Sequence, residues 1–108
     1  MTKHDFCYLY LTCENTTEAT EIAEALLNKR LVVCAKQMPV SSDFHWQGTI
    51  EHGNEILLLM QSRLDLFEQV EAEVAKTHSY DTFVLEAVPI SKISSDAEKW
   101  MKENLEND

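Results

Sequence analysis

Three short segments of this chain are apolar at both alternating sets of positions, which limits how a sheet built from them can be covered. They are Phe6–Cys13, Glu55–Gln61 and Thr82–Ile90, and they are rich in aromatic, leucine and β-branched residues. Such runs predict strands. A strand with one face in water should be polar at every second position. Neither set follows that pattern here, and Glu86 is the single charge in 83–90. Both faces of the sheet therefore need a covering layer.

Helices are expected between and after these strands. Three pairs of residues have the spacing of a helix N-cap and its partner three residues later. Each pair precedes apolar residues that recur at helical spacing. The pairs are Asn15 with Glu18, Ser62 with Asp65, and Ser95 with Glu98, and the apolar stripes lie within 19–27, 66–74 and 97–105.

A long hairpin is expected in the middle of the chain. Leu31–Met38 predicts a second strand that stops or bends at Pro39, and strand character resumes over Ser42–Ile50. Gly48 within that run predicts a bulge. The turn is expected at Glu51–Asn54, because Gly and Asn tolerate positive φ. The chain then returns through Glu55–Gln61.

The resulting order, β-α-β-β-α-β followed by a C-terminal helix, predicts a single α+β domain over residues 1–108. Right-handed crossovers place both main helices on one face of a four-stranded antiparallel sheet, which is the ferredoxin-like plan. The other face would then expose several large apolar side chains, and such a patch on a soluble protein marks an interface. We expect a homo-oligomer. The alternative is that the C-terminal helix alone covers this face.

Charge and composition exclude several kinds of partner. The formal net charge is −10, from 19 acidic and nine basic residues, so nucleic acid and anionic membrane surfaces are not expected to bind. No apolar run is long enough to span a bilayer, and Met1–Asp5 does not begin a signal peptide. The cysteines, Cys7, Cys13 and Cys34, are odd in number. Reduced thiols and a cytoplasmic location are therefore expected.

A series of short motifs, in register from about Tyr8 to Leu105, resembles the CutA family. The series comprises Leu31-Val32-Val33-Cys34-Ala35, Met38-Pro39, Trp46-Gln47-Gly48, Asn54-Glu55-Ile56-Leu57-Leu58-Leu59, Ser62-Arg63, His78-Ser79-Tyr80-Asp81 and Ala87-Val88-Pro89. The resemblance implies a ferredoxin-like fold close to the PII signalling proteins and assembly as a tight homotrimer. It also implies an association with tolerance of divalent metals, especially copper, and no catalytic reaction. The alternative function is a non-catalytic trimeric scaffold, or a PII-like signalling module without metal.

Cys34 and His78 are the residues matching the family that offer ligands for copper or another divalent metal. Thiolate and imidazole suit Cu(I), Cu(II) or Zn(II), and such ions need three or four converging ligands. The chain has no C-x-x-C motif, so the ligands would have to converge through folding or across subunits. A buried structural role for Cys34 and a helix C-terminal role for His78 are the alternatives.

The chain departs from the family pattern at several positions. Leu11 stands where some members have a cysteine proposed to bind copper, and Gln61 where a lysine is usual. The family usually has H-P-Y-E where this chain has His78-Ser79-Tyr80-Asp81. A following proline–glutamate pair is replaced by Phe83-Val84, and the change at Val84 removes a carboxylate from the region of the expected site.

Two further functions are compatible with these residues, a small-ligand site and an enzyme. Trp46 and Tyr80 could line a small-ligand cleft between subunits, although packing within a hairpin interface is the alternative. An enzyme would use Cys34 as nucleophile and His78 as its base. A strand offers no group that stabilises a thiolate, and two glycines are too few for a phosphate-binding loop. We therefore expect no catalysis.

Overall fold

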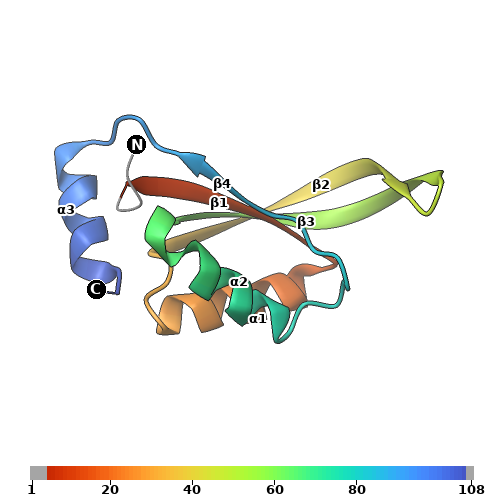
Figure 1. The fold of residues 1–108 in the computed structure, drawn as a ribbon, viewed down its shortest axis with the longest axis horizontal. Coiled ribbons are helices and arrows are strands. Elements are labelled where there is room, and N and C mark those ends of the chain that lie inside the picture. The colour runs from red at the N-terminus through yellow and green to blue at the C-terminus, as the bar shows by residue number, and fades with distance from the viewer. Residues whose placement is uncertain (1–4, 107–108) are drawn as a thin grey trace.

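A computed structural model describes residues 5–106, which form a four-stranded antiparallel sheet with helices (Figure 1). The sheet order is β2-β3-β1-β4, so the ferredoxin-like prediction is confirmed. Residues 1–4 and 107–108, which belong to the predicted 1–108 domain, lie outside the described part. The elements are β1 (Phe6–Cys13), α1 (Thr16–Asn28), β2 (Cys34–Trp46), β3 (Thr49–Arg63), the 3-10 helix η1 (Leu64–Leu66), α2 (Phe67–Ala75), β4 (Leu85–Pro89) and α3 (Ser95–Asn104).

Helices α1 and α2 lie side by side against one face of the sheet (Figure 1). This covered face is made by every second residue of β1 and β3, and it packs on the apolar stripes of the two helices. Burial of each large apolar side chain contributes about 1.5–3 kcal/mol. The buried residues include Cys7, Leu9, Leu11 and Cys13 of β1, Leu58 and Met60 of β3, Ala19, Ile22 and Leu26 of α1, and Val70 and Val74 of α2.

One of the three predicted helix caps is confirmed. The Asn15 side chain accepts a hydrogen bond from the Glu18 amide at 2.9 Å, at the start of α1. The prediction for Ser62 was wrong, because Ser62 belongs to β3 and its buried hydroxyl donates to the Leu31 carbonyl at 2.6 Å. The prediction for Ser95 was also wrong, since Ser94 takes the cap position of α3 and makes no side-chain cap bond there.

The hairpin turn was predicted in the wrong place. Gln47 and Gly48 form the turn with φ values of 49° and 83°, the left-handed pair that a two-residue type I′ turn requires. Glu51–Asn54 instead lies within β3, and Gly48 is no bulge. The strand does not stop at Pro39 either, because β2 is an edge strand that tolerates a missing N–H. β2 begins at Cys34 rather than Leu31, and β4 is shorter than predicted.

The second face of the sheet remains uncovered within residues 5–106. Helix α3 lies at one end of the sheet rather than over its centre (Figure 1). It is held there by buried Met101 and Leu105, and by the Glu106 carbonyl, which accepts from Arg63 at 2.9 Å. We call the uncovered side the open face. It carries Tyr8, Tyr10 and Thr12 of β1, Leu57, Leu59 and Gln61 of β3, Cys34, Lys36 and Met38 of β2, and Glu86 and Val88 of β4.

Candidate functional site

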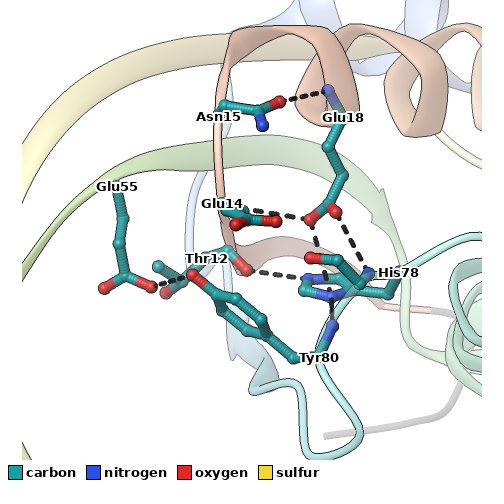
Figure 2. Close-up of polar contacts among 8 residues, drawn as sticks. Thr12, Glu14, Asn15, Glu18, Glu55, His78 and Tyr80 are labelled. Atoms are coloured by element: carbon teal, nitrogen blue, oxygen red, sulfur yellow. Dashed lines mark hydrogen bonds and ion pairs between the residues drawn. The ribbon is translucent and has the colours of Figure 1, made fainter.

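A buried histidine joins the loop after α2 to the end of β1. The His78 side chain is 0% exposed, and its Nε2 lies 2.9 Å from the Thr12 carbonyl oxygen (Figure 2). A carbonyl can only accept, so Nε2 carries the proton. Nδ1 accepts a hydrogen bond from the Tyr80 amide at 3.0 Å. Both ring nitrogens of the neutral imidazole are therefore used.

Glu18 connects the same loop to the start of α1 (Figure 2). Its carboxylate accepts from the Glu14 amide at 3.2 Å and from the Ser79 amide at 3.0 Å, and it lies 3.5 Å from His78 Nδ1. Burial acts to raise the pKa of Glu18, but the hydrogen bonds from Ser79 and Glu14 outweigh it. The net effect lowers that pKa, so the carboxylate is ionised at neutral pH.

Tyr80 ties the loop to β3. Its hydroxyl donates to Glu55 Oε2 at 2.6 Å (Figure 2). Burial, and then the bond to the Glu55 carboxylate, raise the pKa of Tyr80 well above its usual value. The imidazole of His78 lies between two rings, 4.9 Å from that of Tyr80 and 5.3 Å from that of Phe83. The loop is thus fixed to β1, α1 and β3 at once.

Cys13 places a thiol beside this network. Ligand atoms of Cys13, Glu18 and His78 all lie within 4.8 Å of one another. Burial raises the pKa of Cys13 to about 12, and the Glu18 and Glu55 carboxylates add to the effect. The thiol is therefore protonated at neutral pH and is a poor nucleophile.

The sulfur, carboxylate and imidazole of this cluster are the donor types that divalent metals use, yet they do not fit a metal ion as arranged. A metal-binding imidazole needs a free lone pair, and His78 Nδ1 already accepts the Tyr80 amide. Glu18 accepts two further amides. Among residues 5–106, no buried side-chain nitrogen or oxygen lacks a hydrogen-bond partner. His78, Glu18 and Tyr80 form a hydrogen-bonded network that holds the loop.

The structure does not bring Cys34 and His78 together within one chain. Cys34 is half-buried on the open face opposite Gln61, where its Sγ accepts a bond from Lys36 Nζ at 3.4 Å. His78 contacts Thr12, at the other end of β1. Trp46 and Tyr80 are also apart, because Trp46 lies at the hairpin end opposite Thr49 whereas Tyr80 contacts Glu55. Either pair would need a second subunit to meet.

Sequence reasoning missed Cys13, Glu18 and Glu55 as neighbours of His78. Glu18 was assigned only to the helix cap, and the cap is real. The contacts join residues 61 and 66 positions apart, and no spacing rule covers such distances. The one available signal was that Cys13 shares a strand face with Leu11, the position at which some members of the family have a cysteine proposed to bind copper.

Comparison with known proteins gives one consistent family. Residues 7–104 match the family described as CutA1 divalent ion tolerance protein. The Divalent-cation tolerance protein CutA of Archaeoglobus fulgidus is 34% identical over 99 residues, which are 92% of this chain and 97% of that protein. Its structure, described as that of a periplasmic protein, has a TM-score of 0.91 and covers 94% of this chain and 99% of that one.

A second solved structure agrees with the first. The divalent cation tolerance protein (Cut A1) from Thermus thermophilus is 27% identical, has a TM-score of 0.90, and covers 94% of this chain and 99% of that one. Within the described part of the chain, no helix combines the length and apolarity needed to cross a bilayer.

Proposed function

Because this chain belongs to the CutA1 divalent ion tolerance protein family, we propose that it works as a non-catalytic homotrimer in divalent-metal tolerance. In this proposal a metal ion, with copper as the first candidate, or a small ligand binds where subunits meet. The observation that carries the proposal is the open face. Several large apolar side chains lie there with no element of residues 5–106 over them.

The open face is large because the hairpin extends it. Phe44 and Trp46 belong to the same alternating set of β2 as Met38, which pairs with Leu57 of β3. Phe44 is 42% exposed, Trp46 46% and Val88 45%. A contiguous patch of this kind favours association. A second copy offers the same apolar surface, and the projecting hairpin (Figure 1) could reach over a neighbouring subunit.

Cys34 is the residue of the expected metal pair that lies on this face. Thiolates favour copper and zinc. Among residues 5–106, the one hydrogen-bond partner of the Cys34 sulfur is the Lys36 ammonium. Further ligands, including the His78 imidazole after release of the Tyr80 amide, would come from another copy. Trp46 of one subunit beside Tyr80 of another would form the small-ligand cleft.

The cytoplasm is the proposed compartment. Cys7, Cys13 and Cys34 are all free thiols, and reducing compartments keep thiols in this state. The Archaeoglobus fulgidus relative, by contrast, is described as periplasmic.

A scaffold or PII-like signalling module without metal is the second candidate, and one observation favours it. Both ring nitrogens of His78 in the Cys13–Glu18–His78 cluster are already hydrogen-bonded to backbone, which opposes metal binding there. The function of the cluster would then be to hold the loop that forms part of a partner-binding surface. A protein that co-purifies with the metal-free trimer would favour this candidate.

Metal titration of the reduced full chain distinguishes the two candidates. We expect Cu(I) and Zn(II) to bind the wild type more tightly than a Cys34→Ala, His78→Ala double variant. The single variant Cys34→Ala, at a half-buried position, separates loss of a metal ligand from loss of folding in the double variant. Equal affinity in all three proteins would reject the junction metal site and leave the scaffold.

A further inference from the structure

The outer part of the β2–β3 hairpin has two chemically different faces. One face carries Phe44 and Trp46 and continues the open face. The other carries the cross-strand pairs Ser41–Asn54, Asp43–His52 and His45–Ile50. We call Asp43, His45 and His52 the hairpin triad. Helices α1 and α2 do not extend over this part of the hairpin (Figure 1), so the triad is exposed.

Asp43 and His52 form a close pair across the two strands. His52 Nδ1 lies 2.5 Å from Asp43 Oδ1, and the two side chains are 74% and 76% exposed. An ionised carboxylate can only accept, so Nδ1–H donates to it. The lone pair of Nε2 is then directed away from Asp43. Carboxylates orient metal-binding imidazoles in this way.

His45 supplies a second imidazole on the same face. It lies two residues from Asp43 along β2, and its partner Ile50 lies two residues from His52 along β3. Residues placed diagonally on one sheet face have Cα atoms about 7–8 Å apart, a distance that long side chains bridge. The ligand atoms of the three side chains do not yet lie within 4.8 Å of one another, as those of Cys13, Glu18 and His78 do. A change of the exposed His45 side-chain rotamer would bring a second imidazole to an ion beside His52 and Asp43.

We propose that the hairpin triad is a surface site for a borderline divalent transition-metal ion. His45 and His52 provide imidazole nitrogens, Asp43 orients His52 and adds negative charge, and water fills the remaining positions. Imidazole ligands favour Ni(II), Cu(II) and Zn(II) over Mg(II) and Ca(II). The chain's net charge of −10 raises the local concentration of cations.

The triad site is independent of the proposed function. All its residues come from one hairpin, whereas the proposed junction site needs Cys34 and a second subunit. It also faces away from Phe44 and Trp46, so a copy bound on the open face leaves this side of the hairpin uncovered by that contact.

Calorimetric titration of the chelator-treated full chain with Ni(II) tests the proposal, since Ni(II) does not oxidise the thiols. We expect one ion per chain, at least tenfold weaker binding in His45→Ala and in His52→Ala, and none in the double variant. Mg(II) should not compete. Matched controls are Cys34→Ala and His4→Ala, which should bind Ni(II) as the wild type does.

Two results would overturn the triad site. One is wild-type affinity in the His45→Ala, His52→Ala variant, which would mean that Asp43–His52 is only a cross-strand contact. The other is loss of Ni(II) binding in Cys34→Ala but not in the triad variants, which would assign the ion to the junction. Paramagnetic broadening of the His45 and His52 ring signals, with His78 unaffected, would support the triad directly.

Discussion

At the scale of single residues, His78 fixes the loop after α2 through two hydrogen bonds made inside the protein. It donates to the Thr12 carbonyl and accepts from the Tyr80 amide. Each bond joins the side chain to a backbone group, so the imidazole takes the place of water as the hydrogen-bond partner of that group. Glu18 and Tyr80 add bonds from the same loop to α1 and β3.

Replacing His78 tests this structural role. His78→Ala leaves the Thr12 carbonyl and Tyr80 amide without their partner, and each unsatisfied buried group costs about 1–3 kcal/mol. We expect the free energy of unfolding to fall by about 2–4 kcal/mol, as measured by urea denaturation. His52→Ala, at a 74% exposed side chain, is the matched control and should change it by less than about 0.5 kcal/mol. Equal effects would contradict the role assigned to His78.

Acid stability should depend on Glu18. Burial raises its pKa, but the bonds from Ser79 and Glu14 lower it overall. A folded-state pKa below the unfolded value, about 4.3, gives stability that is present above that pH and is lost as pH falls through the folded-state pKa. Glu18→Gln should therefore lose less stability than the wild type between neutral pH and the acid limb. Parallel denaturation curves for the two proteins over that range would disprove the linkage.

Cys7 and Cys13 should be unreactive thiols in the native protein. Burial first, and then nearby carboxylates, raise the pKa of Cys7 to about 11 and that of Cys13 to about 12. Both should resist alkylation in the native protein near neutral pH. Because their pKa values are higher in the folded than in the unfolded state, the free energy of unfolding should fall as pH rises from the unfolded-state pKa, about 8.5, through these folded-state pKa values. Mass spectrometry after labelling counts the modified thiols. Rapid native labelling of Cys13 would contradict its burial.

At the scale of elements, the hairpin turn shows what local sequence signals can and cannot decide. Gln47-Gly48 and Gly53-Asn54 both contain residues that tolerate positive φ, so local propensity did not separate them. The register of the strands selects the first, because it sets Met38 opposite Leu57. A turn at Gly53-Asn54 would place the partner of Met38 beyond the end of β3, so the apolar residues of β2 would lose their partners.

Gly48 and Gly53 provide a matched pair of variants. Gly48 has φ +83°, and a Cβ there would have no described atom within 4 Å, so Gly48→Ala should cost about 1–2 kcal/mol from backbone strain alone. Gly53 lies within β3, where a Cβ would be 3.8 Å from the Phe44 ring, an ordinary contact. Gly53→Ala should be neutral or stabilising by up to about 1 kcal/mol. The reverse order of stabilities would contradict the turn position.

Local signals were sufficient for other elements. Strand β1 and the Asn15 cap of α1 depend on neighbouring residues and were predicted correctly. The caps at Ser62 and Ser95 failed because tertiary contacts and an adjacent serine take those roles. The network around His78 could not be predicted, since Glu18, Glu55 and His78 meet only after the sheet and loop have formed.

At the scale of the whole molecule, the open face and the hairpin that extends it favour association of several copies. The described chain measures 44 × 26 × 22 Å, and the hairpin forms its projecting end (Figure 1). The sequence contains strands that are apolar on both faces, and the structure shows which face of the sheet is uncovered (Figure 1). Assembly of identical copies would cover it and would complete the junctions where Cys34 lies.

A charge on the open face should disrupt this assembly. Leu59→Lys places an ammonium beside Tyr10 and Lys36, and burying it without a partner costs several kcal/mol. Each 1.4 kcal/mol is about a tenfold change in affinity, so association should weaken by at least about a hundredfold. Glu71→Lys, on the exposed side of α2, is the control and should assemble normally. Assembly of Leu59→Lys at wild-type affinity would exclude this face as the interface.

Sedimentation equilibrium of the wild-type full chain at micromolar concentration measures the oligomeric state on which the proposed function depends. We expect a species with three times the chain mass of 12.4 kDa, because copies of the same chain cover the open face. A single species of 12.4 kDa across the concentration range would contradict it.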